Sequence, residues 1–311
     1  AGAEFGGNVR VAAARLIVHG ELDTLTWPAN KPMFPDAVVL HNINPPAIRR
    51  PTTITHGVAR SGGGIFCMAS AFPDSGVHLG LGTIISHSSA NGDNQDEGGG
   101  GISTVLCDVR LYGALLLHNK ANSTGGGGGA VRLGARSRLV VSENTRFTGN
   151  VALAGSGGAV LCDKCHGMDL SVGTHFENNV ANLDGGAVGL LNPISVTARS
   201  SDSVFRGNTA IKGDGGAVYV LYHNANGMWK SSNGDQFEGN HASNGSGGAF
   251  AAMGTKIYLK DRASCANNSA PRGGGGCIFW DPLDSAKWNS SAPSIESDEQ
   301  LVFSGNSAEY G

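Results

Sequence analysis

A pair of glycines followed by a small or apolar residue recurs along this chain at a nearly constant spacing. The first residues of the pairs are Gly63, Gly100, Gly128, Gly157, Gly185, Gly215, Gly247 and Gly275. Successive pairs are 28 to 37 residues apart, and most of the steps are close to 29. A fixed period of this size is the signature of a solenoid, in which each unit buries its apolar face only against its neighbours.

A second motif, FxxN, lies upstream of four of the glycine pairs. Its aromatic residues are Phe147, Phe176, Phe205 and Phe237, and its amide residues are Asn150, Asn179, Asn208 and Asn240. Another copy runs from Phe303 to Asn306, and weaker forms begin at Ile54, Leu116 and Cys265. We expect each Phe to point inward and stack on the next, and each Asn to turn the chain in a left-handed conformation while its amide bonds the local backbone.

The repeat favours strands over helices. A glycine pair inside every helix would cost about 1 kcal/mol per Gly, and no apolar spacing of 3.6 residues accompanies it. The Leu-x-Leu ladder of leucine-rich repeats is missing. Short β-branched runs at 140–141, 218–220 and 257–259, bounded by Gly, Asn and Asp, are typical of strands. We therefore predict an all-β fold, a right-handed single-stranded parallel β-helix of about eight or nine coils of about 29 residues, with three short strands per coil.

The glycine pair has a physical role in this fold. Glycine adopts a positive φ at a bend without strain, and its missing side chain allows successive coils to approach closely. The Ala or Ile that follows then returns to the core.

The paired motifs FTGN…GSGGAV, FENN…DGGAV, FRGN…GDGGAV and FEGN…GSGGAF resemble the FxxN and GGA(I/L/V) repeats of the chlamydial polymorphic outer membrane proteins. The resemblance covers roughly residues 54–311. It implies a β-helical passenger region that acts as an adhesin at a cell surface, and hence an extracellular or cell-surface location. Repeats of this kind also occur in extracellular proteins of protists and algae, so they identify a scaffold better than an organism.

The two ends of the chain differ from the regular repeat. Residues 1–53 open with a repeat-like FGGN but contain six prolines, which cannot donate to a central ladder, so we expect a first coil or cap with a proline-rich excursion. Residues 54–311 form the repeats and stop where a glycine pair is due. We expect the β-helix either to continue in a longer polypeptide or to stack head-to-tail or laterally on other subunits, which builds fibres when the contact does not close.

Six cysteines form an even set with 15 possible pairings, which suits an oxidising compartment. Cys265 and Cys277 occupy two core positions of one coil, which favours a disulfide, and Cys67 and Cys107 lie about one coil apart and could also pair. Cys162, Cys165 and His166 match the C-x-x-C-H attachment pattern of c-type haem, but a local disulfide or two unrelated thiols suit a thin coil better, and zinc would lack a fourth ligand. We expect no cofactor and no metal.

Surface chemistry narrows the class of partner. The net charge of -3 and the absence of a basic run argue against nucleic acid, and no apolar stretch is long enough to span a membrane. The sequons at Asn122, Asn244, Asn267 and Asn289 permit N-glycosylation. Two expected loops, 222–236 and 280–300, carry Trp229, Trp280 and Trp288, which suit either a contact surface or burial beneath the loop.

The function predicted from these features is structural or adhesive and not catalytic. We expect the protein to be a subunit of an extracellular fibre or surface layer. Its expected partners are other protein subunits and a cell-surface or glycan ligand. The alternative is a polysaccharide lyase or glycosidase, since such enzymes also use β-helices. They need carboxylates clustered across successive coils, and the acids singled out, in the loop at 93–97 and at Asp108 and Asp163, do not recur at matching positions.

Overall fold

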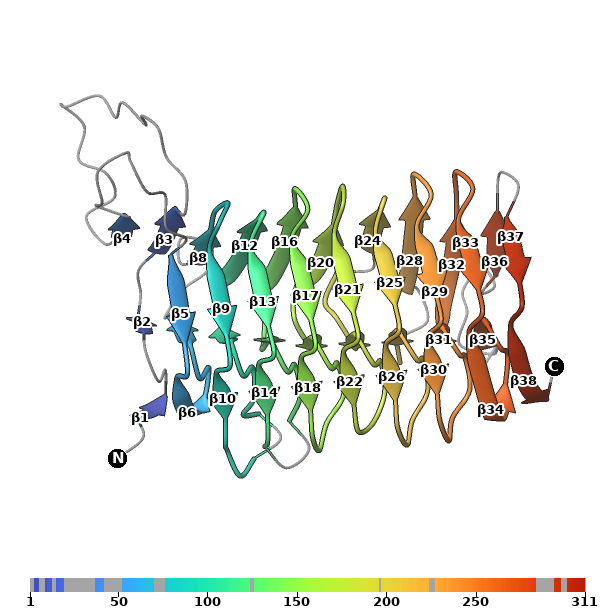
Figure 1. Ribbon diagram of the computed structural model, residues 1–311, viewed down its shortest axis with the longest axis horizontal. Helices are drawn as coiled ribbons and strands as arrows, with labels where there is room; N and C mark the ends of the chain where they lie inside the picture. Colours follow the sequence, from blue (N-terminus) through green and yellow to red (C-terminus); the bar gives the residue numbers. More distant parts are fainter. Residues whose placement is uncertain are drawn as a thin grey trace.

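The computed structural model describes residues 52–310, apart from 70–75, 95, 124–125, 196, 224–226, 284–293 and 298–300, together with four strands between residues 3 and 41. The regular secondary structure of these residues consists of β-strands alone, which form four parallel sheets along a rod (Figure 1). From residue 53 on, the chain passes through sheets D, A, B and C in that order and then repeats the circuit one level further on. The all-β parallel solenoid predicted from the repeat is confirmed.

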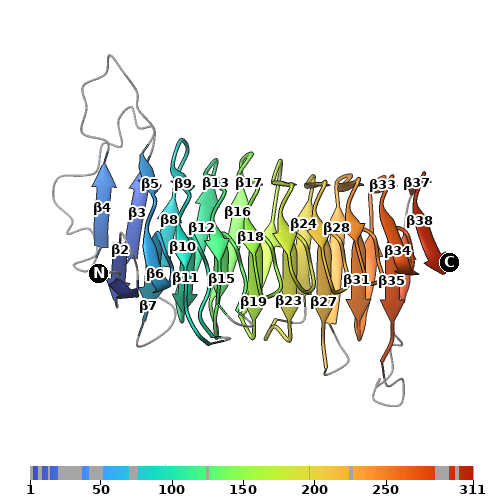
Figure 2. The ribbon, with the colours of Figure 1, turned by 60° about the horizontal axis from the view of Figure 1, so that its bottom comes forward.

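The sheets are named A to D, and their strands are given in spatial order. Sheet A contains β1 (Ala3–Phe5), β6 (Val58–Ser61), β10 (Ser89–Ala90), β14 (Lys120–Ala121), β18 (Val151–Ala152), β22 (Val180–Ala181), β26 (Thr209–Ala210), β30 (His241–Ala242), β34 (Ser269–Gly274) and β38 (Ser307–Tyr310). Sheet B, which comes forward in Figure 2, contains β2 (Val9–Ala12), β7 (Ile65–Met68), β11 (Ile102–Val105), β15 (Val131–Leu133), β19 (Val160–Asp163), β23 (Val188–Leu191), β27 (Val218–Leu221), β31 (Phe250–Met253) and β35 (Ile278–Asp281).

The other two sheets complete the circuit. Sheet C contains β4 (Ala37–His41), β3 (Arg15–His19), β8 (Gly76–Leu79), β12 (Asp108–Tyr112), β16 (Arg138–Ser142), β20 (Gly167–Leu170), β24 (Thr197–Ser201), β28 (Gly227–Ser232), β32 (Thr255–Leu259) and β36 (Ile295–Ser297). Sheet D contains β5 (Thr53–Thr55), β9 (Ile84–Ser86), β13 (Leu115–Leu117), β17 (Arg146–Thr148), β21 (His175–Glu177), β25 (Val204–Arg206), β29 (Gln236–Glu238), β33 (Ser264–Ala266) and β37 (Val302–Ser304).

The coil has four strands and not the three that were predicted. The predicted corner at FxxN is present, and the residue before the Asn is left-handed there, as at Gly149 with φ 63° and Asn178 with φ 55°. This bend separates the strand of sheet D from the two-residue strand of sheet A. The predicted number and size of the coils, eight or nine of about 29 residues, are not confirmed. The direction of winding and the domain boundary at residue 53 stay predictions.

The left-handed position in FxxN is therefore one residue earlier than predicted. Asn150 does not have a positive φ, nor do Asn179, Asn208 and Asn240. Glycine occupies the preceding position at Gly149, Gly207 and Gly239, because it adopts this conformation without strain. The prediction was wrong because the two neighbouring residues both suit a turn, and only the backbone distinguishes them.

The two glycines of each pair are required for different reasons. In the regular repeats the first glycine is left-handed, as at Gly157 with φ 67°, and the second has no room for a side chain. A Cβ on Gly158 would lie 2.6 Å from the backbone nitrogen of Val180 in the next coil. In the two earliest repeats the left-handed residues are Gly62 and Gly99, so the pairs identified there were aligned one residue too late.

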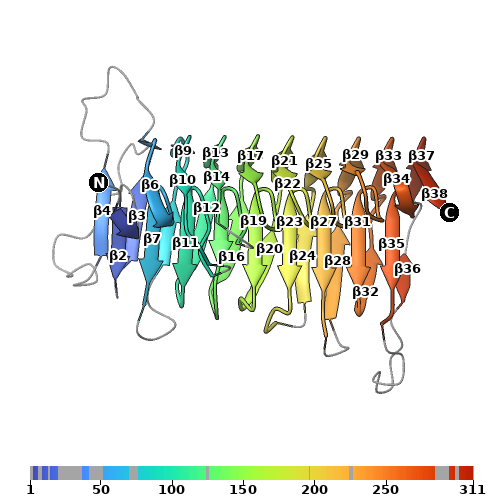
Figure 3. The same cartoon turned by 90° about the horizontal axis from the view of Figure 1, so that it is seen from below.

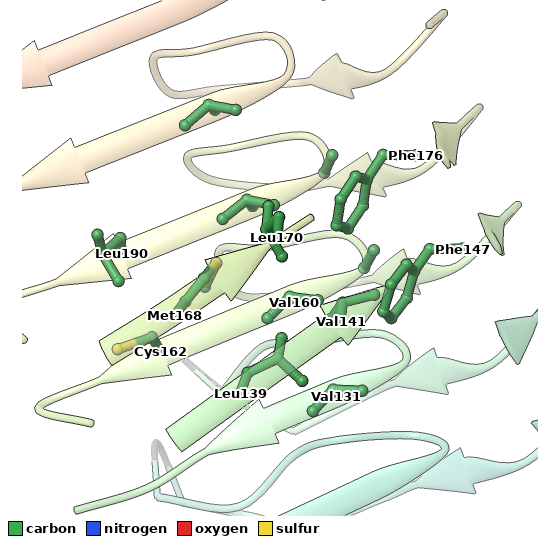
Figure 4. Packing of buried hydrophobic residues seen from close by; sticks show 14 of the residues in the cluster. Val131, Leu139, Val141, Phe147, Val160, Cys162, Met168, Leu170, Phe176 and Leu190 are labelled. Atoms are coloured by element: carbon green, nitrogen blue, oxygen red, sulfur yellow. The ribbon is translucent and has the colours of Figure 1, made fainter. Parts of the chain in front are cut away.

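The core is a column of apolar side chains inside the four sheets. Val131 and Val160 lie on neighbouring strands of sheet B and face Leu139 and Phe147, which come from sheets C and D (Figure 4). Each of these side chains is fully buried. Because every level repeats the same inward positions in register, each coil covers the core of the one before it.

Two expected loops contain strands instead. Trp229 belongs to β28 and is fully buried, with its ring edge-on to Phe250 at a centroid distance of 5.4 Å. Trp280 belongs to β35, is half-buried, and donates from Nε1 to the main-chain oxygen of Thr255 at 2.9 Å. The alternation of buried and outward residues in β28 was missed because Gly227 and several serines interrupt the apolar pattern. Trp288 lies outside the described residues.

Candidate functional site

The aromatic residues of FxxN form one stack inside sheet D. Ring centroids of Phe147 and Phe176 are 4.7 Å apart, and the next two steps, through Phe205 to Phe237, are 5.0 and 4.9 Å, with planes within 5° of parallel. Leu116 and Cys265 occupy the same register position on either side of this stack. Phe303 follows Cys265 in register, but its side chain is 51 % exposed.

The Asn residues form a second, buried ladder beside the aromatic stack. The Oδ1 of Asn179 accepts hydrogen bonds from both the backbone nitrogen and the Nδ2 of Asn150, each at 3.0 Å. The Nδ2 of Asn179 in turn donates to Oδ1 of Asn208 and to the main-chain oxygen of Phe147, both at 3.0 Å. The same pattern continues through Asn240, Asn268 and Asn306. These amides bond between coils, whereas we had expected them to bond the local backbone.

Three histidines stack at the outer bend between sheets D and A. His56, His87 and His118 occupy the same left-handed position in three successive coils, with φ between 53° and 57°. Their ring centroids are 5.2 and 5.4 Å apart. In the next coil this position is Gly149, where a Cβ would meet the His118 ring. The stack of rings ends at Gly149, which has no side chain and where the His118 ring fills the space that a Cβ would need.

The six cysteines form three disulfides. Cys67 pairs with Cys107 across neighbouring coils, with a Cα–Cα distance of 6.1 Å. Cys265 pairs with Cys277 within one coil at a Cα–Cα distance of 6.2 Å. Both disulfides follow from the fold, because the coil places two inward-facing cysteines within disulfide distance in each case.

The third disulfide joins Cys162 to Cys165 and removes the haem interpretation of C-x-x-C-H. Both residues are fully buried, and their Cα atoms are 5.3 Å apart. Thioether attachment of haem needs two free thiols, and zinc needs thiolates. Neither is present here while the disulfide is intact.

Two carboxylates that the sequence interpretation did not single out recur at matching positions. Asp184 and Asp214 precede the glycine pairs of successive coils, where Ser156 and Ser246 stand in the flanking coils. Asp184 accepts a hydrogen bond at 3.0 Å from the backbone nitrogen of Asp214. The shared letters of DGGAV and GDGGAV could have revealed this pair.

The Asp184 and Asp214 pair does not resemble a catalytic dyad. Burial raises the pKa of Asp184, and the negative charge of Asp214 raises it further, although hydrogen bonds from the Asp214 backbone and Ser156 oppose the shift. Burial and the two carboxylates also raise the pKa of the Tyr219 phenol. Each carboxylate accepts a backbone N–H of the next coil, a role that the serines fill elsewhere. The pair is therefore explained by the stacking of the loops.

A second buried acid, Glu97, holds the loop in which it lies against the coil. Glu97 accepts hydrogen bonds from Arg60 Nε at 2.9 Å and from the backbone nitrogens of Asp93 and Asn94 at 2.6 and 3.0 Å. Burial opposes ionisation, but Arg60 and these N–H groups hold the pKa of Glu97 below its ordinary value. The loop at 93–97 is thus fastened to the coil by its own carboxylate.

Arg132 is a buried cation outside the core. Its side chain is 3 % exposed, and its Nη2 lies 3.4 Å from Asp96 and 3.6 Å from Asp163. The three residues come from three successive coils and join the acidic loop to sheet B. Asp163 is thereby accounted for as an ion-pair partner. The other acid singled out, Asp108, is half-buried at the start of β12, and burial raises its pKa.

Asp235 is the most buried carboxylate described. It accepts hydrogen bonds from Ser200 Oγ and, at 2.8 Å, from the backbone nitrogen of Ser203. Burial raises its pKa to about 6, although these hydrogen bonds oppose the shift. The position has Thr174 and Ser203 in the preceding coils, so the acid replaces a hydroxyl inside the wall of the rod.

An apolar pocket lies between the last coils, lined by Phe237, Phe250, Leu259, Ala263, Ser264, Cys265, Cys277, Ile278 and Phe303. None of these side chains titrates while the disulfide is intact. Among the described residues no group of three or more His, Cys, Asp and Glu side chains could hold a metal ion. The described residues also include no helix able to cross a membrane.

The sequons differ in accessibility. Asn244 and Asn267 are exposed, and Asn267 lies at the bend before the buried Asn268. Asn122 is half-buried and donates from Nδ2 to Asn91 at 2.6 Å. Asn289 lies outside the described residues. Although Asn244 is exposed, its Nδ2 donates to the main-chain oxygen of Ile211 at 2.6 Å.

Comparison with known families supports the repeat type. The model of the Chlamydia polymorphic membrane protein repeat matches residues 144–163 and 202–221. Both segments run from just before sheet D, through FxxN and the glycine pair, to the end of a strand of sheet B. The chain thus carries the repeat of this class in at least two of its coils. Searches of curated proteins and of solved structures returned no match.

Proposed function

We propose that this protein is a non-catalytic structural or adhesive rod of an extracellular surface. The observation that supports the proposal most is the use made of the repeated residues. The Phe, Asn and Gly residues of the repeat serve to stack one coil on the next, with the Phe stack running from Phe147 to Phe237 and the Asn ladder unbroken from Asn119 to Asn306. The outward residues vary from coil to coil, as expected when a constant scaffold displays a variable surface.

The disulfides and the repeat class support the same role. Disulfides persist in oxidising compartments, and all six cysteines are paired. The matched repeat is that of polymorphic membrane proteins. Surface display is tested by immunogold labelling of intact source cells with antibody against the folded rod. Gold particles on unpermeabilised cells support the proposal, whereas labelling only after permeabilisation contradicts it.

The polysaccharide-cleaving alternative is tested separately. Digestion of neutral and acidic polysaccharides, with and without a chelator, should release no new reducing ends and no unsaturated products. A measurable turnover that is lost on substituting Asp184 or Asp214 would replace the structural function with an enzymatic one.

We further propose that another β-coil covers the edge formed by β37 and β38. Phe303 occupies an inward position of sheet D yet is 51 % exposed, and the aromatic Tyr310 is 65 % exposed. A coil of the same design, from another copy or from a longer chain, would bury them and pair the free strand edge. Sedimentation of the intact source material should give a mass well above 31.7 kDa. A monomer of that mass would refute the assembly.

A further inference from the structure

The outer face of sheet C carries a register of basic residues. In β24, β28 and β32 buried residues such as Trp229 and Ile257 alternate with outward ones. Register places Arg199 directly opposite Lys230, and Lys230 directly opposite Tyr258. Lys256 lies two residues before Tyr258 on the same outer face. Figure 3 shows the three strands side by side on one side of the rod.

The arrangement opposes like charges on neighbouring strands. Arg199 and Lys230 are one strand spacing apart, about 4.8 Å between backbones, and like charges directly opposite each other destabilise a sheet. Within the described residues none of Arg199, Lys230 and Lys256 forms an ion pair. Arg138, by contrast, is neutralised by Asp169. The fold therefore holds three cations together, and within the described residues no acid lies in ion-pair contact with any of them.

This cluster is not typical of the surface. The chain carries a net charge of -3, and many of the described acids lie in the glycine-rich loops between sheets A and B, as at Asp93, Asp184 and Asp214. Sheet C thus presents positive charge on a molecule that is negative overall. A locally positive face of this kind attracts anionic ligands in a salt-dependent way.

Acids at both ends limit the cluster to three coils. Asp169 lies opposite Arg199, and Glu296 lies opposite Tyr258. Hydrogen bonds from Ser294 and Tyr258 hold the pKa of Glu296 below its ordinary value, and the positive charge of Lys256 lowers it further, so Glu296 is the carboxylate neighbour of Lys256 beyond ion-pair distance. A short cationic stretch between carboxylates, on a negative protein, disfavours a densely charged nucleic acid. It suits a polymer whose acid groups are spaced apart.

We propose that the outer face of β24, β28 and β32 binds a linear acidic polysaccharide through Arg199, Lys230 and Lys256. This inference rests on the proposed surface role and names the partner class. The polymer lies along the rod, because equivalent positions recur once per coil in that direction. Arg199 binds a carboxylate or sulfate with two parallel hydrogen bonds, the two lysines bind as point charges, and Tyr258 contacts a sugar ring.

The test measures binding of the intact rod to immobilised hyaluronate and polygalacturonate, with dextran as the uncharged probe. The wild type should bind both acidic polymers at low salt and elute as salt rises, without binding dextran. The variant R199Q/K230Q/K256Q should lose about tenfold or more in affinity, the loss expected for charged hydrogen bonds. Circular dichroism and the thermal midpoint establish that the variant is folded.

The matched control is K120Q/R146Q/K212Q, which removes the same charge from sheets A and D and from a loop. It should keep wild-type affinity within about twofold, since screening confines surface charges to short range. Equal losses in both variants, or no binding by the wild type, would overturn the proposal. Vesicles with phosphatidylserine form another arm, and preference for them over both polymers would also overturn it. If polysaccharide binding fails but antibody still labels the surface of intact cells, this binding proposal is wrong and the proposed surface function is still supported.

Discussion

At the scale of single residues, the buried polar groups show how strongly the fold changes their chemistry. Asp235 replaces a hydroxyl in the wall of the rod, and its carboxylate meets two hydrogen-bond donors but no cation within the described ion pairs. An amide at Asn179 is equally buried, yet all its hydrogen-bonding groups are used. One group therefore costs stability when charged, while the other supports the stack.

Asp235→Asn should stabilise the protein at neutral pH. The folded pKa of about 6 lies above the ordinary value of 3.8, so the folded state binds the proton more tightly. Stability is then highest below about pH 4 and falls as pH rises through 6, by about 3 kcal/mol for this shift. Urea unfolding at pH 5 and 7.5 should show a smaller difference for the variant. Asp93→Asn, at an exposed acid, should change little, and an unchanged pH dependence in Asp235→Asn would contradict the assignment.

Asn179→Ala should destabilise the rod by about 3 to 5 kcal/mol. The change removes the acceptor of the Asn150 backbone N–H and of one Asn150 amide N–H, and the donor to Asn208 Oδ1 and to the Phe147 carbonyl, in a buried place, at about 1 to 3 kcal/mol for each group left without a partner. The control is Asn178→Gly at the adjacent exposed bend, where other coils already have glycine. Denaturant unfolding should separate the two variants clearly. Equal stabilities would mean that the ladder contributes nothing.

The sequence predicted these residues unevenly. The inward Phe stack followed from burial and spacing alone. The Asn ladder did not, because the same motif satisfies its amides either within a turn or between coils, and only the register decides. Trp229 was placed in a loop since glycine and serine mask the alternation of its strand.

At the scale of elements, the bends determine how closely the coils stack. The second glycine of each pair has an ordinary φ but no space for a side chain. Gly239, by contrast, has a φ of 61°, and a Cβ added there would meet nothing within 4 Å. The sequence interpretation assigned both a positive φ and the close approach of coils to the glycine pair as a whole. In the structure these two requirements fall on different glycines.

Gly158→Ala should therefore cost more than Gly239→Ala. The first places a methyl group against the backbone of the next coil, which cannot move without breaking a ladder, and we expect a loss of about 3 kcal/mol or more. The second pays only for the left-handed backbone, about 1 kcal/mol. Thermal midpoints of both variants test the order. The reverse order would show that φ, and not space, restricts the glycine pairs.

The disulfides should differ in their contribution according to the loop that each one closes. Replacing Cys67 and Cys107 together by Ala opens a separation of 40 residues and should cost about 4 kcal/mol in the chain-entropy model. Replacing Cys162 and Cys165 opens a separation of 3 and should cost about 2 kcal/mol. Urea unfolding of the two double variants measures the difference. A larger loss for the second pair would contradict the entropic explanation.

At the scale of the whole molecule, one repeat unit determines the architecture and leaves the surface free to vary. The spacing of FxxN and GG was sufficient to predict a parallel solenoid. The number of strands per coil was not predictable, since FxxN and the glycine pair mark only two of the four corners. The basic face of sheet C was also hidden, because Arg199, Lys230 and Lys256 are about a coil apart in sequence and meet only when the coils are in register.

The account depends on coils that stack in parallel and in register. A crystal structure of the protein tests this most directly. It should show the rings of Phe147, Phe176, Phe205 and Phe237 in one column at spacings near 4.7 to 5.0 Å, with the amide of each FxxN Asn bonded to the next. A sandwich or helical fold, or Phe rings that do not form a column, would contradict it.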